Sequence, residues 1–101
     1  MFSTVDLQRA HIIVRSMRLF LDGLQRARRQ PNRREAYHIC KAMEQLRAGQ
    51  LHDSEESLQS ADRREPIPTE IGNNVAYNEP PALHQLQVAL DSIEAELAIA
   101  P

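Results

Sequence analysis

The chain has 101 residues, a formal net charge of −2 and 42% hydrophobic residues. This length excludes a multi-domain protein and allows one domain with a modest core, so we treat residues 1–101 as a single helical domain. The sequence has no tryptophan, two tyrosines and two phenylalanines. Its core must therefore be aliphatic, which favours helix packing over a β-sandwich.

The single cysteine, Cys40, excludes an internal disulfide and fits a reducing compartment. No apolar run approaches the roughly 18–20 residues of a membrane span. The first residues also lack the basic-then-apolar order of a signal peptide. We therefore expect a soluble cytoplasmic protein without membrane contact.

Charge is divided unevenly along the sequence. Residues 1–50 hold ten Lys or Arg against four Asp or Glu, a balance of +6, whereas residues 51–101 hold two against ten, a balance of −8. This asymmetry has two interpretations: the halves face each other within one fold, or they meet charged partner surfaces. Eleven of the twelve basic residues are arginine. Arginine suits bidentate contacts to phosphate or carboxylate groups, but its excess over lysine is also expected from a GC-rich genome.

The first predicted element is a helix over residues 4–29, with Ser3 or Thr4 as its N-cap. Apolar residues recur at alternating spacings of three and four, which is typical of one helical face. This face comprises Leu7, Ala10, Val14, Met17, Leu21 and Leu24. A second apolar flank comprises Ile12, Ile13, Leu19 and Phe20. So wide an apolar surface must be covered from more than one side, by this chain or by a second copy.

Pro31 interrupts the helical pattern, and a second helix is predicted over residues 33–48. Asn32 with Glu35 three residues later forms a capping-box sequence, and Gly49 suits the left-handed position after a helix. Because the connection is short, the two helices should form an antiparallel hairpin.

A third, short helix is predicted over residues 54–62. It should be peripheral or partly frayed, because Leu58 and Ala61 are its only apolar residues. Residues 63–80 form a proline-rich crossover loop. The alternating apolar residues between Ile67 and Tyr77 leave two interpretations open, a small β-hairpin or a loop pinned onto the helices.

The last predicted helix covers residues 81–98, with Asn78 as a candidate cap. Its apolar residues form a coiled-coil-like seam of Leu83, Leu86, Leu90, Ile93 and Leu97. The predicted fold class is therefore all-α: an antiparallel helical hairpin plus a C-terminal helix, three to four helices in all, with a proline-rich crossover loop.

Catalytic and metal motifs are incomplete. His38 and Cys40 are two residues apart, so on a helix they point to different sides and do not form a nucleophile–base pair. Glu35 and His38 match the spacing of helical carboxylate metal sites, but a second such motif is missing. The three glycines are scattered and build no phosphate loop. We expect no enzyme activity, no cofactor and no metal.

Five arginines flank the predicted turn at Pro31, and we call them the arginine knob. They are Arg26, Arg28, Arg29, Arg33 and Arg34. The knob has three interpretations: a solvated helix end, a contact for an acidic protein surface, or a contact for nucleic-acid phosphates. The loop residues Ile71, Val75 and Tyr77 are the other candidate partner-binding residues.

These features together predict a non-catalytic protein–protein interaction module, a small regulatory or chaperone-like adaptor that self-associates as a homodimer. The alternative is a nucleic-acid-binding regulator that uses the arginine knob. A third interpretation is an enzyme subunit that is inactive without its partner.

Overall fold

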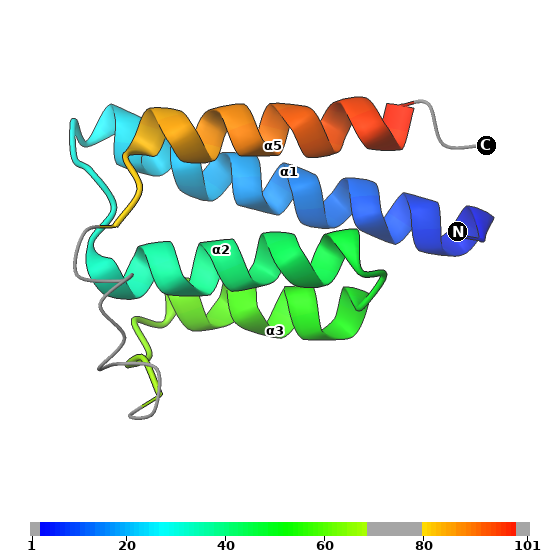
Figure 1. The fold of residues 1–101 in the computed structure, drawn as a ribbon, viewed down its shortest axis with the longest axis horizontal. Coiled ribbons are helices and arrows are strands. Elements are labelled where there is room, and N and C mark those ends of the chain that lie inside the picture. Colours follow the sequence, from blue (N-terminus) through cyan, green and yellow to red (C-terminus); the bar gives the residue numbers. More distant parts are fainter. Residues whose placement is uncertain (1–2, 69–79, 99–101) are drawn as a thin grey trace.

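The computed structural model describes residues 3–68 and 80–98, and this part of the chain contains helices and no strand (Figure 1). The four helices are α1 (Thr4–Arg26), α2 (Arg33–Arg47), α3 (Leu51–Asp62) and α5 (Leu83–Ala98). The predicted all-α fold class is confirmed.

The helices pack as two antiparallel pairs, α2 with α3 and α1 with α5 (Figure 1). α1 also lies against α3, which joins the two pairs. α1 and α2 run in opposite directions, as a hairpin requires, but each has its closest neighbour elsewhere. The described residues therefore form a four-helix arrangement in which the start of α1, the end of α5 and the α2–α3 turn lie at one end (Figure 1).

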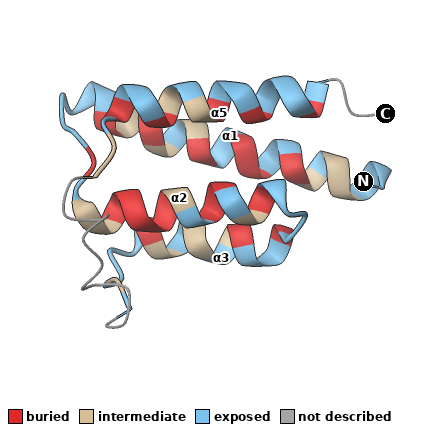
Figure 2. Ribbon diagram, in the orientation of Figure 1, coloured by how far each residue is buried: buried red, intermediate tan, exposed pale blue. Residues whose placement is uncertain are grey.

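The core follows the apolar faces that the sequence predicts (Figure 2). On α1, the predicted face is buried from Ala10 to Leu24. On α5, all five seam residues are buried, from Leu83 to Leu97. Buried residues of all four helices belong to one continuous cluster, so the helices share a single core.

The C-terminal ends of α1, α2 and α3 share one geometry, in which a residue just after the helix adopts the left-handed conformation. α1 ends at Arg26 rather than at the predicted Arg29, because Arg28 adopts a left-handed φ of 54° and the chain turns. The Arg29 N–H then donates to the Leu24 carbonyl at 3.0 Å, which closes the helix. Gly49 (φ 81°) ends α2 in the predicted left-handed conformation, and Arg64 (φ 61°) follows α3 in the same way.

The N-terminal ends of α1 and α2 are capped as predicted. The Ser3 side chain accepts a hydrogen bond from the Asp6 N–H at 3.1 Å. Asn32 and Glu35 form both hydrogen bonds of a capping box. These bonds satisfy amide groups that a helix start would otherwise leave without partners.

The start of α5 depends on a distant residue. The helix begins at Leu83, after the predicted start at residue 81, and the Leu83 N–H donates to the Gln30 side-chain oxygen at 2.7 Å. Gln30 belongs to the α1–α2 connection, so one amide side chain ties that connection to the last helix. The candidate cap Asn78 lies outside the described residues.

The prediction that the third helix is peripheral is wrong. α3 starts at Leu51, before the predicted residue 54, and it is the closest neighbour of α2. Ser54 is fully buried, and its hydroxyl donates to the Ala42 carbonyl at 2.7 Å. Small side chains such as Ala42 and Ser54 let two helix backbones approach closely, and a search for bulky apolar residues misses them.

The crossover loop is only partly described. Residues 63–68 are not helical, and residues 69–79 lie outside the described part of the chain. Both interpretations of the segment from Ile67 to Tyr77 therefore stay predictions.

Ser54→Leu tests the close α2–α3 packing. Leucine at this fully buried position should overpack the interface and lower the free energy of unfolding by about 1–3 kcal/mol. The matched control is Ser92→Leu on the exposed side of α5, which should change stability by about 0.5 kcal/mol or less. Urea unfolding followed by circular dichroism measures both, and equal losses would contradict the packing described here.

Candidate functional site

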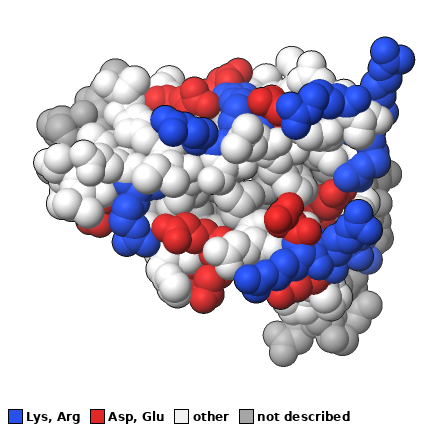
Figure 3. Space-filling view, turned by 180° about the vertical axis from the view of Figure 1, so that it is seen from behind, with Lys and Arg blue, Asp and Glu red and all other residues white. Residues whose placement is uncertain are grey.

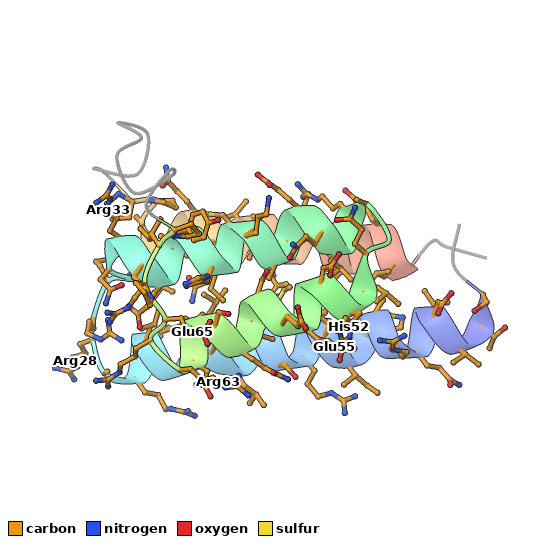
Figure 4. All side chains as sticks on the ribbon, turned by 90° about the horizontal axis from the view of Figure 1, so that it is seen from below. Arg28, Arg33, His52, Glu55, Arg63 and Glu65 are labelled. Carbon is orange, nitrogen blue, oxygen red and sulfur yellow. The ribbon has the colours of Figure 1, made fainter. Side chains whose placement is uncertain are left out.

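The predicted arginine knob surrounds the α1–α2 connection. Arg26 is the last residue of α1, and Arg33 and Arg34 are the first residues of α2. Arg26 and Arg28 are exposed, whereas Arg33 and Arg34 are half-buried. Figure 4 shows Arg28 and Arg33 at the same end of the molecule.

Arg29 has a structural partner. Its guanidinium donates two hydrogen bonds to the Glu35 carboxylate, at 2.7 and 2.8 Å. The Glu35 side chain is only 8% exposed, and it also accepts from the Asn32 N–H at 2.9 Å. The hydrogen bonds from Arg29 hold the pKa of Glu35 below its usual value, and the backbone bond from Asn32 adds a smaller lowering. Arg29 therefore compensates a buried carboxylate, and its guanidinium is already engaged within the fold.

Two arginines that the knob did not include lie at the same end. Arg63 and Arg64 follow α3, and Figure 4 shows Arg63 in the same half of the molecule as Arg28 and Arg33, on the side where Arg28 lies. Sequence reasoning missed them because they join the knob only when α3 runs back antiparallel to α2. A pattern of paired arginines just after a predicted helix was the available signal.

We call this end of the fold the basic end. Its residues are the five knob arginines, Arg63 and Arg64, together with the acids Asp22, Glu35, Asp62 and Glu65. Seven arginines against four acids leave a balance of +3. Figure 3 shows the blue side chains gathering at this end.

The opposite end is acidic, and we call it the acidic end. It comprises residues 44–56 around the α2–α3 turn and residues 91–98 at the end of α5. These two segments hold seven acids and one arginine, Arg47, a balance of −6. The charge asymmetry between the sequence halves thus becomes a separation of charge along the helix axes.

An apolar groove opens between α1 and α3 on the face that Figure 3 presents. Its volume is about 540 Å³, and its apolar lining includes Ile12, Leu19 and Phe20 of α1 and Leu58 of α3. Ile12 is 59% exposed and Leu19 is 60% exposed. Both belong to the second apolar flank predicted from the sequence. Of the rest of that flank, Ile13 is buried and Phe20 is half-buried, so Ile12 and Leu19 form its exposed part.

The groove continues toward the basic end. A second hollow of about 280 Å³ shares Leu19 and Phe20 with the first and reaches Arg29 and Arg64. Gly23 also lines it, and a Cβ placed on Gly23 would meet nothing within 4 Å among the described residues. Gly23 therefore does not serve a close helix crossing within the described part of the chain.

A charged pair borders the groove at its other end. The Arg9 guanidinium contacts the Glu55 carboxylate at 3.0 Å, joining α1 to α3. On the far side of α1, Arg18 bonds both Asp91 and Glu94 of α5, at 2.6 and 2.7 Å. The apolar groove thus lies between rows of charged side chains (Figure 3).

The residues considered for chemistry are engaged in structural contacts. Glu35 bonds Arg29, and the His38 Nε2 lies 2.8 Å from the Glu65 carbonyl oxygen. Burial raises the pKa of the Cys40 thiol, and the negative charge of Glu44 raises it further by a smaller amount. The thiol therefore stays in the unreactive protonated form. Within residues 3–68 and 80–98, no three His, Cys, Asp or Glu side chains gather as metal ligands would.

The three loop candidates for partner binding, Ile71, Val75 and Tyr77, lie outside the described residues, so their role stays a prediction. None of the described helices combines the length and hydropathy that a membrane crossing requires.

Comparison of the chain with protein-family models, with curated proteins and with solved structures finds no match.

Glu35→Gln tests the contact between Arg29 and Glu35. Because the folded state lowers the Glu35 pKa, its carboxylate stabilises the fold above the unfolded pKa, near 4.5, and this contribution disappears as pH falls through the lowered value. We expect a loss of about 1–2 kcal/mol at about pH 7 and a much smaller loss at about pH 3. Urea unfolding at both pH values measures the difference.

The control for this variant is Glu96→Gln, at an exposed residue near the end of α5. It should leave stability within about 0.5 kcal/mol of the parent chain at about pH 7. A Glu35→Gln loss that is the same at both pH values would show that the carboxylate charge does not stabilise the connection.

Proposed function

We propose that this chain is a non-catalytic protein–protein interaction module, a small regulatory or chaperone-like adaptor that contacts proteins through its apolar groove. One observation carries the proposal. Ile12 and Leu19 lie on the outside of α1, about 60% exposed, whereas the main apolar faces of α1 and α5 are buried.

Such exposure is unfavourable for an isolated chain. Burying a side chain of this size contributes about 1.5–3 kcal/mol, so covering Ile12, Leu19 and the rest of Phe20 would stabilise a complex substantially. Contiguous apolar surface rimmed by charges is a common mark of a protein-contact site. The basic and acidic ends then orient the approaching partner through long-range attraction.

A photo-crosslinking experiment in the cell that makes this protein tests the proposal. Leu19 is replaced by a photoreactive phenylalanine analogue, and irradiation should yield covalent adducts to protein. The matched control places the same analogue at Val88, which is 52% exposed on the outer face of α5 and away from the groove. Adducts should form at Leu19 and be scarce at Val88, as measured by gel shift and mass spectrometry.

Two outcomes would contradict this function. Equal adduct yields at Leu19 and Val88 would show that the groove is no preferred contact surface. Adducts to nucleic acid in place of protein would favour the second candidate, which follows.

The second candidate function is a nucleic-acid-binding regulator. It is favoured by Arg63 and Arg64, which enlarge the basic end beyond the predicted knob. Two features weaken it. Arg29 is already engaged by Glu35, and the described aromatic residues near these arginines, Phe20 and Tyr37, are half-buried and buried, so they offer little ring surface on which a base could stack.

This second candidate predicts duplex DNA binding that falls steeply with salt, with a slope of about −0.9 for each phosphate contact. Arg28→Glu together with Arg64→Glu should abolish it, because both side chains are exposed at the basic end. Fluorescence anisotropy over a salt series measures the slope. An absence of binding at low salt, or equal binding by the double variant, would exclude phosphate recognition at this end.

A further inference from the structure

We propose that the apolar groove is where two antiparallel copies of this chain meet, so that α1 of one copy packs along α1 of the other. The inference rests on the proposed function of the groove as a protein-contact surface and names the partner. It is carried by the pattern of large and small residues on the exposed side of α1 and by the separation of charge between the two ends.

Three exposed apolar residues on α1 are spaced by seven. They are Val5, Ile12 and Leu19, which are 64%, 59% and 60% exposed. Ser16 and Gly23 follow Ile12 and Leu19 at a spacing of four, and both line the hollows of the groove. From Ile12 to Gly23 the spacings therefore alternate between four and three, which keeps these residues on one stripe, as in a coiled-coil seam.

The stripe is complementary to itself when one copy is turned by 180°. A two-fold axis between Ile12 and Ser16 sets Ile12 of each copy against Ser16 of the partner subunit. The same operation sets Val5 against Gly23 of the partner subunit. Val5 and Ile12 then each meet a small residue, which lets the two helices approach closely without overlap at these positions.

Gly23 supports this arrangement independently. Glycine inside a helix costs about 1 kcal/mol relative to alanine, and nothing described within 4 Å of its Cβ position requires glycine there. In the antiparallel pair, the space beside Gly23 receives Val5 of the partner subunit. In the pair, this side chain therefore fills space that is open beside Gly23 in the single chain.

Arg9 fits the same stripe. It lies opposite Leu19 of the partner subunit in this register. Its guanidinium turns toward α3 and contacts Glu55 at 3.0 Å, so the charged head points away from the seam. The aliphatic part of Arg9 can then cover Leu19 while the charge keeps its partner.

The charged ends favour antiparallel over parallel pairing. Antiparallel packing brings the basic end of one copy, with a balance of +3, beside the acidic end of the other, with a balance of −6. Arg63 and Arg64 after α3 then face the acidic first turns of the partner subunit's α3, where Asp53 and Glu56 lie. A parallel pair would place like ends together and lose this attraction.

Sedimentation equilibrium over a concentration series tests the pairing. The full chain should show a reversible dimer of twice its 11.5 kDa mass. Ile12→Asp should raise the dimer dissociation constant at least about 100-fold, because it places a charge in an apolar seam. The matched control is Val88→Asp, at a similarly exposed residue on α5, which should leave the constant unchanged.

Gly23→Leu provides a second variant that should keep the fold, since a Cβ at this position meets nothing within 4 Å among the described residues and leucine favours a helix over glycine. It should weaken the dimer at least about tenfold by colliding with Val5 of the partner subunit. Circular dichroism confirms that helix content is kept. A monomer at all concentrations, or a dimer that Ile12→Asp and Gly23→Leu leave intact, would overturn the proposal.

Disulfide trapping tests the direction of pairing. In a Cys40→Ala background, a mixture of Val5→Cys and Gly23→Cys chains should oxidise mainly to the mixed dimer. Each variant alone should remain largely monomeric on a non-reducing gel. Rapid self-crosslinking of Val5→Cys would show a parallel pair and overturn the antiparallel arrangement.

The photo-crosslinking experiment at Leu19 separates this inference from the function on which it rests. Adducts between two copies of this chain support both. Adducts only to other proteins keep the interaction function and overturn the second copy as the occupant of the groove. An absence of protein adducts overturns both.

Discussion

The apolar surface of α1 is the constraint on which the fold depends. Its main face, from Ala10 to Leu24, is wide enough to need cover from two sides, and α5 and α3 supply it. The second flank around Ile12 and Leu19 is left uncovered. The core-forming face and the candidate contact surface thus lie on the same helix, because the other three described helices do not enclose the whole circumference of α1.

The α1–α2 connection holds the other parts in register. Arg28 turns the chain, the Arg29–Glu35 contact fastens that turn to the first turn of α2, and Gln30 caps the start of α5. This connection forms much of the basic end. Arg29 therefore acts in the fold, whereas Arg28 of this connection and the arginines after α3 are exposed and are the ones that we propose for steering a partner.

The separation of charge makes the two ends of the groove different, one basic and one acidic. Helix dipoles alone would favour basic residues at the C-terminal ends of α1 and α3, which both lie at the basic end. The acids around the α2–α3 turn and at the end of α5 complete the polarity. In the α1–α1 pairing that we propose, this polarity favours the antiparallel orientation, while the apolar stripe supplies the buried surface.

Local patterns were enough to predict the helical class, the apolar faces of α1 and α5, the capping box at Asn32 and the left-handed Gly49, because each depends on residues within one or two turns of the same helix. Tertiary packing alone decided that α3 is close to α2, since that contact relies on the small residues Ala42 and Ser54, whose pattern carries no hydrophobic signal. It also decided which flank of α1 stays exposed and that Arg63 joins the arginine knob. Those outcomes depend on which helices become neighbours, and that choice is made by the shared core rather than by any one segment.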